Sequence, residues 1–399
     1  MPQTFSARTH WDLQETAYAA AVRAARAQSQ PLLDLTASNP TTCGFSYDHA
    51  AWGAALCAPQ SYIYDPDPRG LRSAREAVAA YYQQGTGVVV DSDAITLTTS
   101  TSEAYSFLFR LLCDPGDEIL IAQPSYPLFD FLATLDSVRL IPYPLFYDHG
   151  WHIDLAALRA AITPRTRAMV VVQPNNPTGH FTQAQERHAL EAICAEQGLA
   201  LIVDEVFLDY AHAAHPEIAS REFSFATGEH PALTFVLSGL SKISALPQMK
   251  VAWIVSHGPQ QELAEALARL EVIADTFLSM NAPLQHALPA MLDARHNMQR
   301  QIRARTQANL AILDEQLRQQ NFVARLHVEA GWYAILRVPA LTTAEETAVQ
   351  LIERQNVLVH PGNFYGMPAQ GWLVVSLLPR EEEFRLGVER IAQFFDQNN

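Results

Sequence analysis

The sequence predicts an α/β fold in which helices cover a mostly parallel β-sheet. Between about residues 94 and 255, short runs of β-branched and other apolar residues alternate with longer amphipathic stretches, a pattern typical of successive β-α units. Turn residues separate these stretches, as in DPGD at 114–117 and QGL at 197–199. The chain of 399 residues exceeds one ordinary hydrophobic core, so we expect two domains.

Seven apolar runs are the expected strands of the sheet, at 94–98, 118–122, 138–142, 168–172, 200–205, 233–238 and 250–255. We expect a large domain over residues 50–285 around this sheet. Residues 1–49 and 286–399 would together form a smaller α+β domain, because their apolar pattern changes to long helical periods around the strand-like segment WLVVSLL.

Helical periodicity dominates the second half of the chain. Apolar or small residues recur at steps of three and four and predict a long helix at about 288–320 that links the two domains: Ala294, Met298, Ile302, Thr306, Leu310, Leu313 and Leu317. A second series, Phe384, Val388, Ile391 and Phe395, predicts a final helix packed on the smaller domain. The N-terminal segment, helical through about residue 28, should fold back onto the same domain.

Composition excludes several classes of function. A formal net charge of -15 without any basic run argues against binding to nucleic acid or to an acidic membrane. No apolar run is long enough to span a bilayer, and the first residues lack the apolar core of a signal peptide. The four cysteines are scattered, without the paired spacing of a zinc site or the density of a disulfide scaffold. These features predict a cytoplasmic protein with no metal site and a small-molecule partner.

Three hydroxyl residues mark a strand-to-helix turn in LTTSTSEAYSFLFRLL. Ser100, Thr101 and Ser102 stand where the free N–H groups and the positive end of the helix dipole face outward. One of them would be enough for an ordinary N-cap. Three together favour a turn that binds a phosphate group, although a simple cap remains the alternative.

Three other polar residues stand beside apolar segments. Asn176 lies in QPNNPTG, where Pro174 and Pro177 impose a tight turn that either is a plain loop or presents a fixed amide to a ligand. Asp204 ends the apolar run ALIVD, where a buried carboxylate is costly unless a cation meets it. Lys242 in SGLSK either extends to water or, when desolvated, becomes an amine able to form a Schiff base.

In their order and spacing these motifs resemble the class I/II (fold-type I) aminotransferases that depend on pyridoxal 5'-phosphate. The resemblance covers nearly the whole chain, from LTASNPT at 35–41 through YDPDPRGLRSA, QPSYPLF, QPNNPTG, VDEVF and SGLSK to VLVHPGNFYG. It implies a fold-type I transferase that moves an amino group from an amino acid to a 2-oxo acid in two ping-pong half-reactions.

The resemblance also implies roles for the motif residues. Lys242 would form the aldimine with pyridoxal phosphate and then move the proton at the substrate Cα. Asp204 would pair with the ring nitrogen and keep it protonated, and Asn176 would bond the ring oxygen. Tyr126 would stack on the ring.

Phosphate binding would come from both subunits of a homodimer. By the resemblance, Ser100, Thr101 and Ser102 hold the cofactor phosphate, and Tyr64 reaches the phosphate of the neighbouring subunit. Shared active sites are therefore implied.

The sequence departs from the family pattern around the lysine. The serine expected three residues before it is Gly239, and the arginine expected eight residues after it is Lys250. Lysine keeps the charge without the bidentate fork, so Ser238 and Ser241 become candidate phosphate ligands. A tyrosine expected near the ring oxygen is Phe207, which leaves Asn176 to make that contact alone.

The arginine that binds the substrate carboxylate in the family should fall at residue 374, where this chain has Val374. The nearest downstream cation is Arg380, which could turn back toward the substrate with help from the amides of Asn39 and Asn176. Alternatively, Arg380 begins the exposed face of the last helix.

Two other functions compete with aminotransfer. The same scaffold and cofactor support β-elimination or decarboxylation, and the missing arginine keeps a lyase or decarboxylase open. A ligand-sensing domain of a transcription regulator would need a helix-turn-helix arm and a basic face, and the first 35 residues provide neither.

Overall fold

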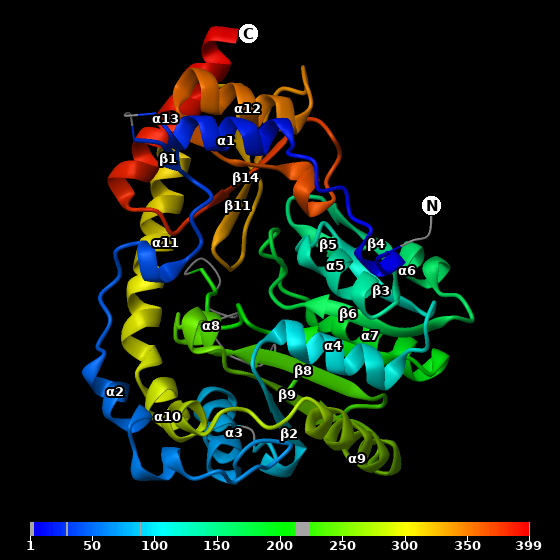
Figure 1. The fold of residues 1–399 in the computed structure, drawn as a ribbon. Helices are drawn as coiled ribbons and strands as arrows, with labels where there is room; N and C mark the ends of the chain where they lie inside the picture. Colours follow the sequence, from blue (N-terminus) through cyan, green and yellow to red (C-terminus); the bar gives the residue numbers. More distant parts are fainter. Residues whose placement is uncertain (1–3, 29–30, 88, 213–223, 399) are drawn as a thin grey trace.

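An eight-stranded sheet forms the centre of the molecule in a computed structural model, which describes residues 4–28, 31–87, 89–212 and 224–398 (Figure 1). Its strand order is β2-β9-β8-β7-β6-β3-β4-β5. The strands are β2 (Ile95–Thr98), β3 (Glu118–Gln123), β4 (Arg139–Tyr147), β5 (Trp151–Ile153), β6 (Thr166–Val172), β7 (Ala200–Asp204), β8 (Thr234–Gly239) and β9 (Ala252–His257). All seven predicted strands are confirmed, and the short edge strand β5 was not predicted.

The sheet is mostly parallel, as expected. Strands β4, β3, β6, β7 and β8 run parallel to one another, whereas β5, β9 and β2 each pair antiparallel with the strands beside them. Every residue of β7 and β8 is buried, which explains why both read as continuous apolar runs. The parallel strands therefore bring their carboxyl ends, including Asp204, to one edge of the sheet.

Helices cover both faces of this sheet. Val170 and Val172 of β6 face a core formed with α4 (Thr101–Leu112), α5 (Leu128–Leu135) and α9 (Gln260–Thr276). Met169 and Val171 face the opposite core, to which α2 (Ala50–Leu56), α3 (Arg72–Thr86), α6 (Leu155–Ala161) and α7 (Ala184–Gln197) contribute. Alternate residues of one strand thus build two separate cores.

The two ends of the chain meet in a second unit. Strand β1 (Leu33–Asp34) pairs in parallel with β12 (Val357–Leu358), and a four-stranded sheet has the order β10-β11-β14-β13. Those strands are β10 (Ala324–Arg325), β11 (Tyr333–Arg337), β13 (His360–Pro361) and β14 (Trp372–Ser376), and the helices beside them are α1 (Ala17–Arg26), α12 (Ala344–Gln355) and α13 (Glu381–Asn398) (Figure 1). The N-terminal segment therefore folds back onto the C-terminal part, as predicted, while the domain boundaries at 49 and 285 stay a prediction.

The long helix predicted at about 288–320 is two helices. Helix α10 (Ala282–Asp293) packs against α2 and α3, and α11 (Arg295–Leu317) packs against α13. The chain bends at Ala294, where buried Arg295 donates a hydrogen bond to the carbonyl of Leu292 at 2.6 Å. Figure 1 shows α11 running from α10 beside the large sheet toward α13 in the second unit. Within the described part of the chain, no helix has both the length and the apolar character needed to cross a membrane.

The turn that carries Asn176 is pressed against the segment before β11. Gly179 ends that turn with φ +71, and a Cβ placed there would lie 2.4 Å from the carbonyl oxygen of Ala330 and 2.4 Å from Cγ2 of Val328. Only glycine satisfies both the left-handed backbone and the close approach. This contact joins the large sheet to the second unit beside the site described below.

We expect Gly179→Ala to lower the free energy of unfolding by about 1–3 kcal/mol more than Gly198→Ala, because overpacking adds to the backbone cost. Gly198 is the matched control, since it is also left-handed (φ +64) but has nothing within 4 Å of its added Cβ. Urea unfolding of both variants measures the difference. If both variants lose the same free energy of unfolding, the segment of Ala330 moves away from the added methyl group at little cost.

Candidate active site

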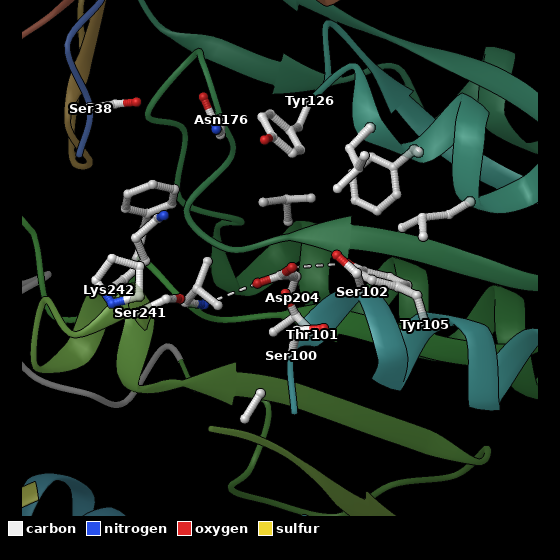
Figure 2. Close-up of a pocket in the computed structure, with 18 of the residues that line it drawn as sticks. Ser38, Ser100, Thr101, Ser102, Tyr105, Tyr126, Asn176, Asp204, Ser241 and Lys242 are labelled. Carbon is white, nitrogen blue, oxygen red and sulfur yellow. Dashed lines mark hydrogen bonds between the residues drawn. The ribbon is translucent and has the colours of Figure 1, made fainter. Parts of the chain in front are cut away.

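A cavity of about 490 Å³ opens at the carboxyl edge of the parallel strands. It collects nine of the residues predicted from sequence: Ser100, Thr101, Ser102, Tyr126, Asn176, Asp204, Ser241, Lys242 and Lys250. Figure 2 shows Lys242, Asp204, Asn176 and Tyr126 projecting toward a common space from four separate segments. Residues far apart in the chain therefore meet at one site, as the α/β topology requires.

Lys242 lies in the short helix α8 (Leu240–Ile243) at one side of the cavity. Its Nζ is 5.6 Å from the ring centre of Phe207 and 5.4 Å from that of Trp332. Desolvation lowers the pKa of this amine, and the charge of Asp204 opposes the shift only in part. Lys242 therefore lies beside two aromatic rings at the cavity wall, and a reactive amine stays the prediction for it.

The chain has only two lysines, Lys242 and Lys250, and both line this cavity. Apart from the histidines, all its other basic side chains are arginines. Lysine differs from arginine in that it loses its proton readily when desolvated. The cavity therefore holds both of the chain's side chains that can become neutral primary amines.

Hydrogen bonds hold the backbone of the lysine segment in place. The buried hydroxyl of Tyr210 donates to the carbonyl of Lys242 at 2.6 Å. Gln299 of α11 donates from Nε2 to the carbonyl of Ile243 at 3.0 Å. The amine consequently extends from a fixed backbone into the cavity.

Asp204 is buried at the end of β7 and faces the same cavity (Figure 2). Burial raises its pKa to about 6, although hydrogen bonds from the Val206 N–H and the Tyr105 hydroxyl, each at 3.1 Å, and the charge of Lys242 act in the opposite direction. A cation placed beside this carboxylate would remove much of the cost of its burial.

The neighbouring carboxylate, Glu205, points away from the cavity, as the alternation of a strand requires. It accepts hydrogen bonds from the Ser224 hydroxyl at 2.7 Å and the Phe225 N–H at 2.5 Å. Burial raises the pKa of Glu205 to about 7. Of the adjacent pair, only Asp204 serves the cavity.

The N-terminus of α4 forms one end of the cavity. Ser100 is the N-cap, and its hydroxyl accepts a hydrogen bond from the Glu103 N–H at 3.1 Å, whereas phosphate binding at this turn stays a prediction. Thr101 and Ser102 line the cavity beside Ser241 and Lys250. Hydroxyls, a helix N-terminus and an ammonium group in one place suit an anion such as phosphate.

Close packing explains why Gly239 replaces the serine of the family. A Cβ at Gly239 would lie 2.8 Å from the carbonyl oxygen of Val251 and 2.9 Å from the Cβ of Ala252 on the paired strand β9. Ser238 does not line the cavity, because its buried side chain points to the carbonyl of Glu205 at 3.4 Å. Of the two proposed substitutes, only Ser241 reaches the cavity.

Three other predicted residues lie outside the cavity lining. The side chain of Asn39 caps a short turn by accepting from the Thr41 N–H at 3.1 Å. Arg380 lies against Gly44, where an added Cβ would be 2.9 Å from the arginine Nε. Tyr64 is 80% exposed and does not line the cavity.

Arg380 was expected to turn back toward the substrate, but it does not line the cavity, and its segment is anchored to α11. Asn309 of α11 donates to the carbonyls of Leu377 and Pro379 at 2.9 and 2.8 Å, and Arg305 donates to the carbonyl of Pro379 at 3.1 Å. These bonds fix the chain just before Arg380 against α11. Within the described residues, no arginine lines the cavity.

Sequence reasoning missed several polar residues that the second unit brings to the cavity: Ser38, Tyr333, His360 and Tyr365. His360 and Tyr365 belong to VLVHPGNFYG and Ser38 to LTASNPT, but the motifs alone do not predict a role for these side chains. Their approach to the cavity depends on pairing between distant segments, which periodicity does not report.

Asn176 has a buried Oδ1 without a hydrogen-bond partner among the described residues. The turn that carries it is fixed from behind by His180, whose Nε2 is 3.0 Å from Glu186 and whose Nδ1 is 3.5 Å from Glu329. Burial alone would lower the pKa of His180, but the two carboxylates outweigh burial and raise it. When protonated, His180 links the turn to the segment before β11 through these two carboxylates.

The folded-state pKa of His180 is raised above its ordinary value of 6.5. Its contribution to stability is therefore complete below pH 6.5 and is lost as pH rises through the folded-state pKa. We expect the stability difference between the wild-type protein and His180→Gln, measured by urea unfolding, to be larger at pH 6 than at pH 9. A difference that is constant or grows with pH would contradict a charged His180.

Comparison with known proteins identifies the family. Residues 49–391 match the family described as aminotransferase class I and II. The chain belongs to this family. It is 27% identical over 380 residues to an alanine aminotransferase of Mycobacterium tuberculosis, covering 92% of this chain and 86% of the relative. It is 26% identical over 378 residues to the glutamate-pyruvate aminotransferase AlaA of Escherichia coli strain K12, covering 92% and 91%.

Solved structures agree on the fold. An alanine aminotransferase from Pyrococcus furiosus superposes with a TM-score of 0.86 at 23% identity, covering 98% of this chain and 100% of that one. An aspartate aminotransferase double mutant of Thermus thermophilus gives 0.82 at 26% identity, covering 98% and 99%. The protein has the α/β fold of fold-type I and is an aminotransferase, and its relatives support aminotransfer over elimination or decarboxylation.

Proposed function

We propose that this aminotransferase uses pyridoxal 5'-phosphate in the cavity described above, with Lys242 as its reactive amine. The observation that carries the proposal is the meeting of a desolvated lysine and a buried carboxylate, Asp204, in one cavity whose far end suits an anion. Asn176 adds an amide at the cavity wall whose Nδ2 can donate a hydrogen bond to a ring oxygen. Lys242 suits the aldehyde of the cofactor, Asp204 the ring nitrogen, Asn176 the ring oxygen, and the far end of the cavity the phosphate.

Pyridoxal phosphate, when bound, supplies an aldehyde that condenses with amines and a protonated ring that accepts electrons. Lys242 contributes an amine whose lowered pKa favours the neutral form, which can accept the proton of a substrate Cα–H. Asp204 contributes a carboxylate that, beside a protonated ring nitrogen, ionises more readily than in its unpaired state. Thr101, Ser102, Ser241 and Lys250 would hold the phosphate.

The side chains around the ring position differ from the family pattern in one respect. Phe207 lines the cavity without a hydroxyl, so Asn176 would be the amide that orients the ring oxygen. Tyr126 is 44% exposed and would cover one face of the ring. With fewer hydrogen bonds at the ring oxygen, the orientation of the cofactor ring would depend more on Asp204 and on the residues that hold the phosphate.

The names of the relatives suggest the first substrates to assay. Two are named for alanine or for glutamate and pyruvate, and another, 28% identical over 335 residues, is an arginine-pyruvate transaminase of Pseudomonas aeruginosa. We therefore propose an α-amino acid as donor and a 2-oxo acid as acceptor, with pyruvate as the first acceptor to test.

We also propose that the protein works as a homodimer. Tyr62, Ile63 and Tyr64 are consecutive and 81%, 62% and 80% exposed, which is unusual for large apolar side chains on a monomer. A second copy would cover these side chains and receive Tyr64 near its own cofactor phosphate.

Sedimentation velocity would show a dimer, and Tyr64→Ala should weaken cofactor binding. A fully active monomer would contradict shared sites, and the cytoplasmic location stays a prediction from the sequence.

The assignment of Lys242 is tested by borohydride reduction of the protein with pyridoxal phosphate, followed by peptide mapping. We expect the label on Lys242 in the wild-type protein and in Lys250→Ala, and neither label nor transamination in Lys242→Ala. Because the chain has only two lysines, the map distinguishes them without ambiguity. A label on Lys250 in the wild-type protein would refute the assignment.

The role of Lys250 is tested by cofactor affinity. Lys250→Ala should weaken pyridoxal phosphate binding by about 1.5–3 kcal/mol, the range for a hydrogen bond to a charged group. Lys250→Arg is the matched control, because it keeps the charge and the same left-handed backbone (φ 49). Fluorescence titration measures both variants. If Lys250→Ala binds the cofactor as tightly as the wild-type protein, the phosphate lies elsewhere.

A further inference from the structure

Val374 occupies the position at which the family would place its carboxylate-binding arginine, and the structure shows what stands next to it. Strand β14 directs Leu373 and Val375 into the core of the second unit. It directs Val374 to the opposite side, into the cluster that contains Tyr333 and Tyr365 of the cavity wall. The side chain of Val374 therefore faces the cavity side of the strand but carries no charge.

His360 is the cross-strand partner of Val374. The antiparallel pairing of β13 with β14 places the two Cα atoms opposite each other. Side chains at directly opposed positions lie on the same face of a sheet with their Cβ atoms about 4.5–5.5 Å apart. His360 thus presents an imidazole beside the place where the arginine would begin, and it lines the cavity.

The ring of His360 is oriented by Tyr365. Its Nδ1 lies 2.9 Å from the Tyr365 hydroxyl, and burial keeps the pKa of that hydroxyl well above its ordinary value. With Nδ1 engaged by a neutral hydroxyl, Nε2 is the nitrogen left to meet a ligand. The Tyr365 backbone is itself tied to the loop of Tyr126, because its carbonyl accepts from the Ser125 N–H at 3.0 Å.

The basic side chains that line the cavity among the described residues are Lys242, Lys250 and His360. Lys242 and Lys250 are accounted for by the reactive amine and the phosphate end. His360 enters from the second unit together with Ser38 and Tyr333, whereas the phosphate end is built by the start of α4 and by residues 250–252. It is therefore the remaining base for an anionic group of the substrate.

We propose that His360 binds the carboxylate of the substrate through Nε2, in place of the arginine that is missing at Val374. The inference rests on the proposed function, since it assumes an amino acid or 2-oxo acid in this cavity. Burial lowers the pKa of free His360, against the charge of Asp34, and an arriving carboxylate favours the charged form. One imidazole gives a single charge-assisted bond where arginine gives two, so recognition of the carboxylate is weaker and less directional.

Propionate is the probe, because it carries a carboxylate but no amino group and so binds without turnover. We expect its dissociation constant for the cofactor-loaded protein, measured by calorimetry, to rise at least tenfold in His360→Ala. Two controls should stay within twofold of the wild-type protein: His188→Ala, at an exposed position of α7, and Arg380→Ala. Unchanged affinity in His360→Ala, or an equal loss in Arg380→Ala, would overturn the proposal.

Two further measurements separate binding from a structural role. His360→Ala should keep the cofactor affinity of the wild-type protein, and the double variant His360→Ala/Val374→Arg should recover propionate binding if it folds. Independently, the imidazole NMR signal that disappears in His360→Gln should shift when propionate is added to the wild-type protein. Absence of that shift would overturn the proposal even if the double variant does not fold.

Failure of this inference and failure of the proposed function give different results. If the wild-type protein neither binds pyridoxal phosphate nor transfers an amino group, the proposed function fails. If it does both, and propionate binds equally well with and without His360, only the assignment of His360 fails.

Discussion

The site depends on the removal of two ionisable groups from water at one edge of a parallel sheet. Asp204 is buried because β7 lies in the middle of the sheet with helices on both faces. Lys242 is desolvated because Phe207 and Trp332 stand beside its ammonium group. Each group is costly without an opposite charge close by. The fold can bear this cost because large apolar cores lie on both sides of the sheet.

Much of the fold could be predicted from the sequence because the sheet is buried on both faces. Strands such as β7 and β8 have no polar alternation and stand out as apolar runs bounded by turns. The break between α10 and α11 could not be predicted, because the apolar spacing continues through Ala294 and the bend follows from two packing partners in different directions. Strand β5 is three residues long, which is too short for an alternation of apolar and polar residues to predict it.

The residues of the candidate site also fall into those that the sequence predicts and those that it does not. Residues held in local motifs, such as Asn176, Asp204 and Lys242, were found from sequence and lie together in the structure. His360 was not, because its position depends on its pairing with Val374 across two strands. Arg380 is the nearest downstream cation to Val374 in the sequence, whereas the bonds from Asn309 hold its segment on α11. Proximity along the chain was a poor guide wherever a strand register decided which residues meet.

The scarcity of lysine has a consequence for how the protein meets reactive aldehydes. Free aldehydes condense with any accessible primary amine, and most proteins offer many such groups on their surface. This chain offers the amines of Lys242 and Lys250, both in one cavity, besides its N-terminus. Its outer surface presents its positive charge as guanidinium groups, which stay protonated and do not form imines under mild conditions. Apart from the N-terminal amine, the primary amines that could capture a carbonyl compound are thereby gathered at the cavity by composition as well as by shape.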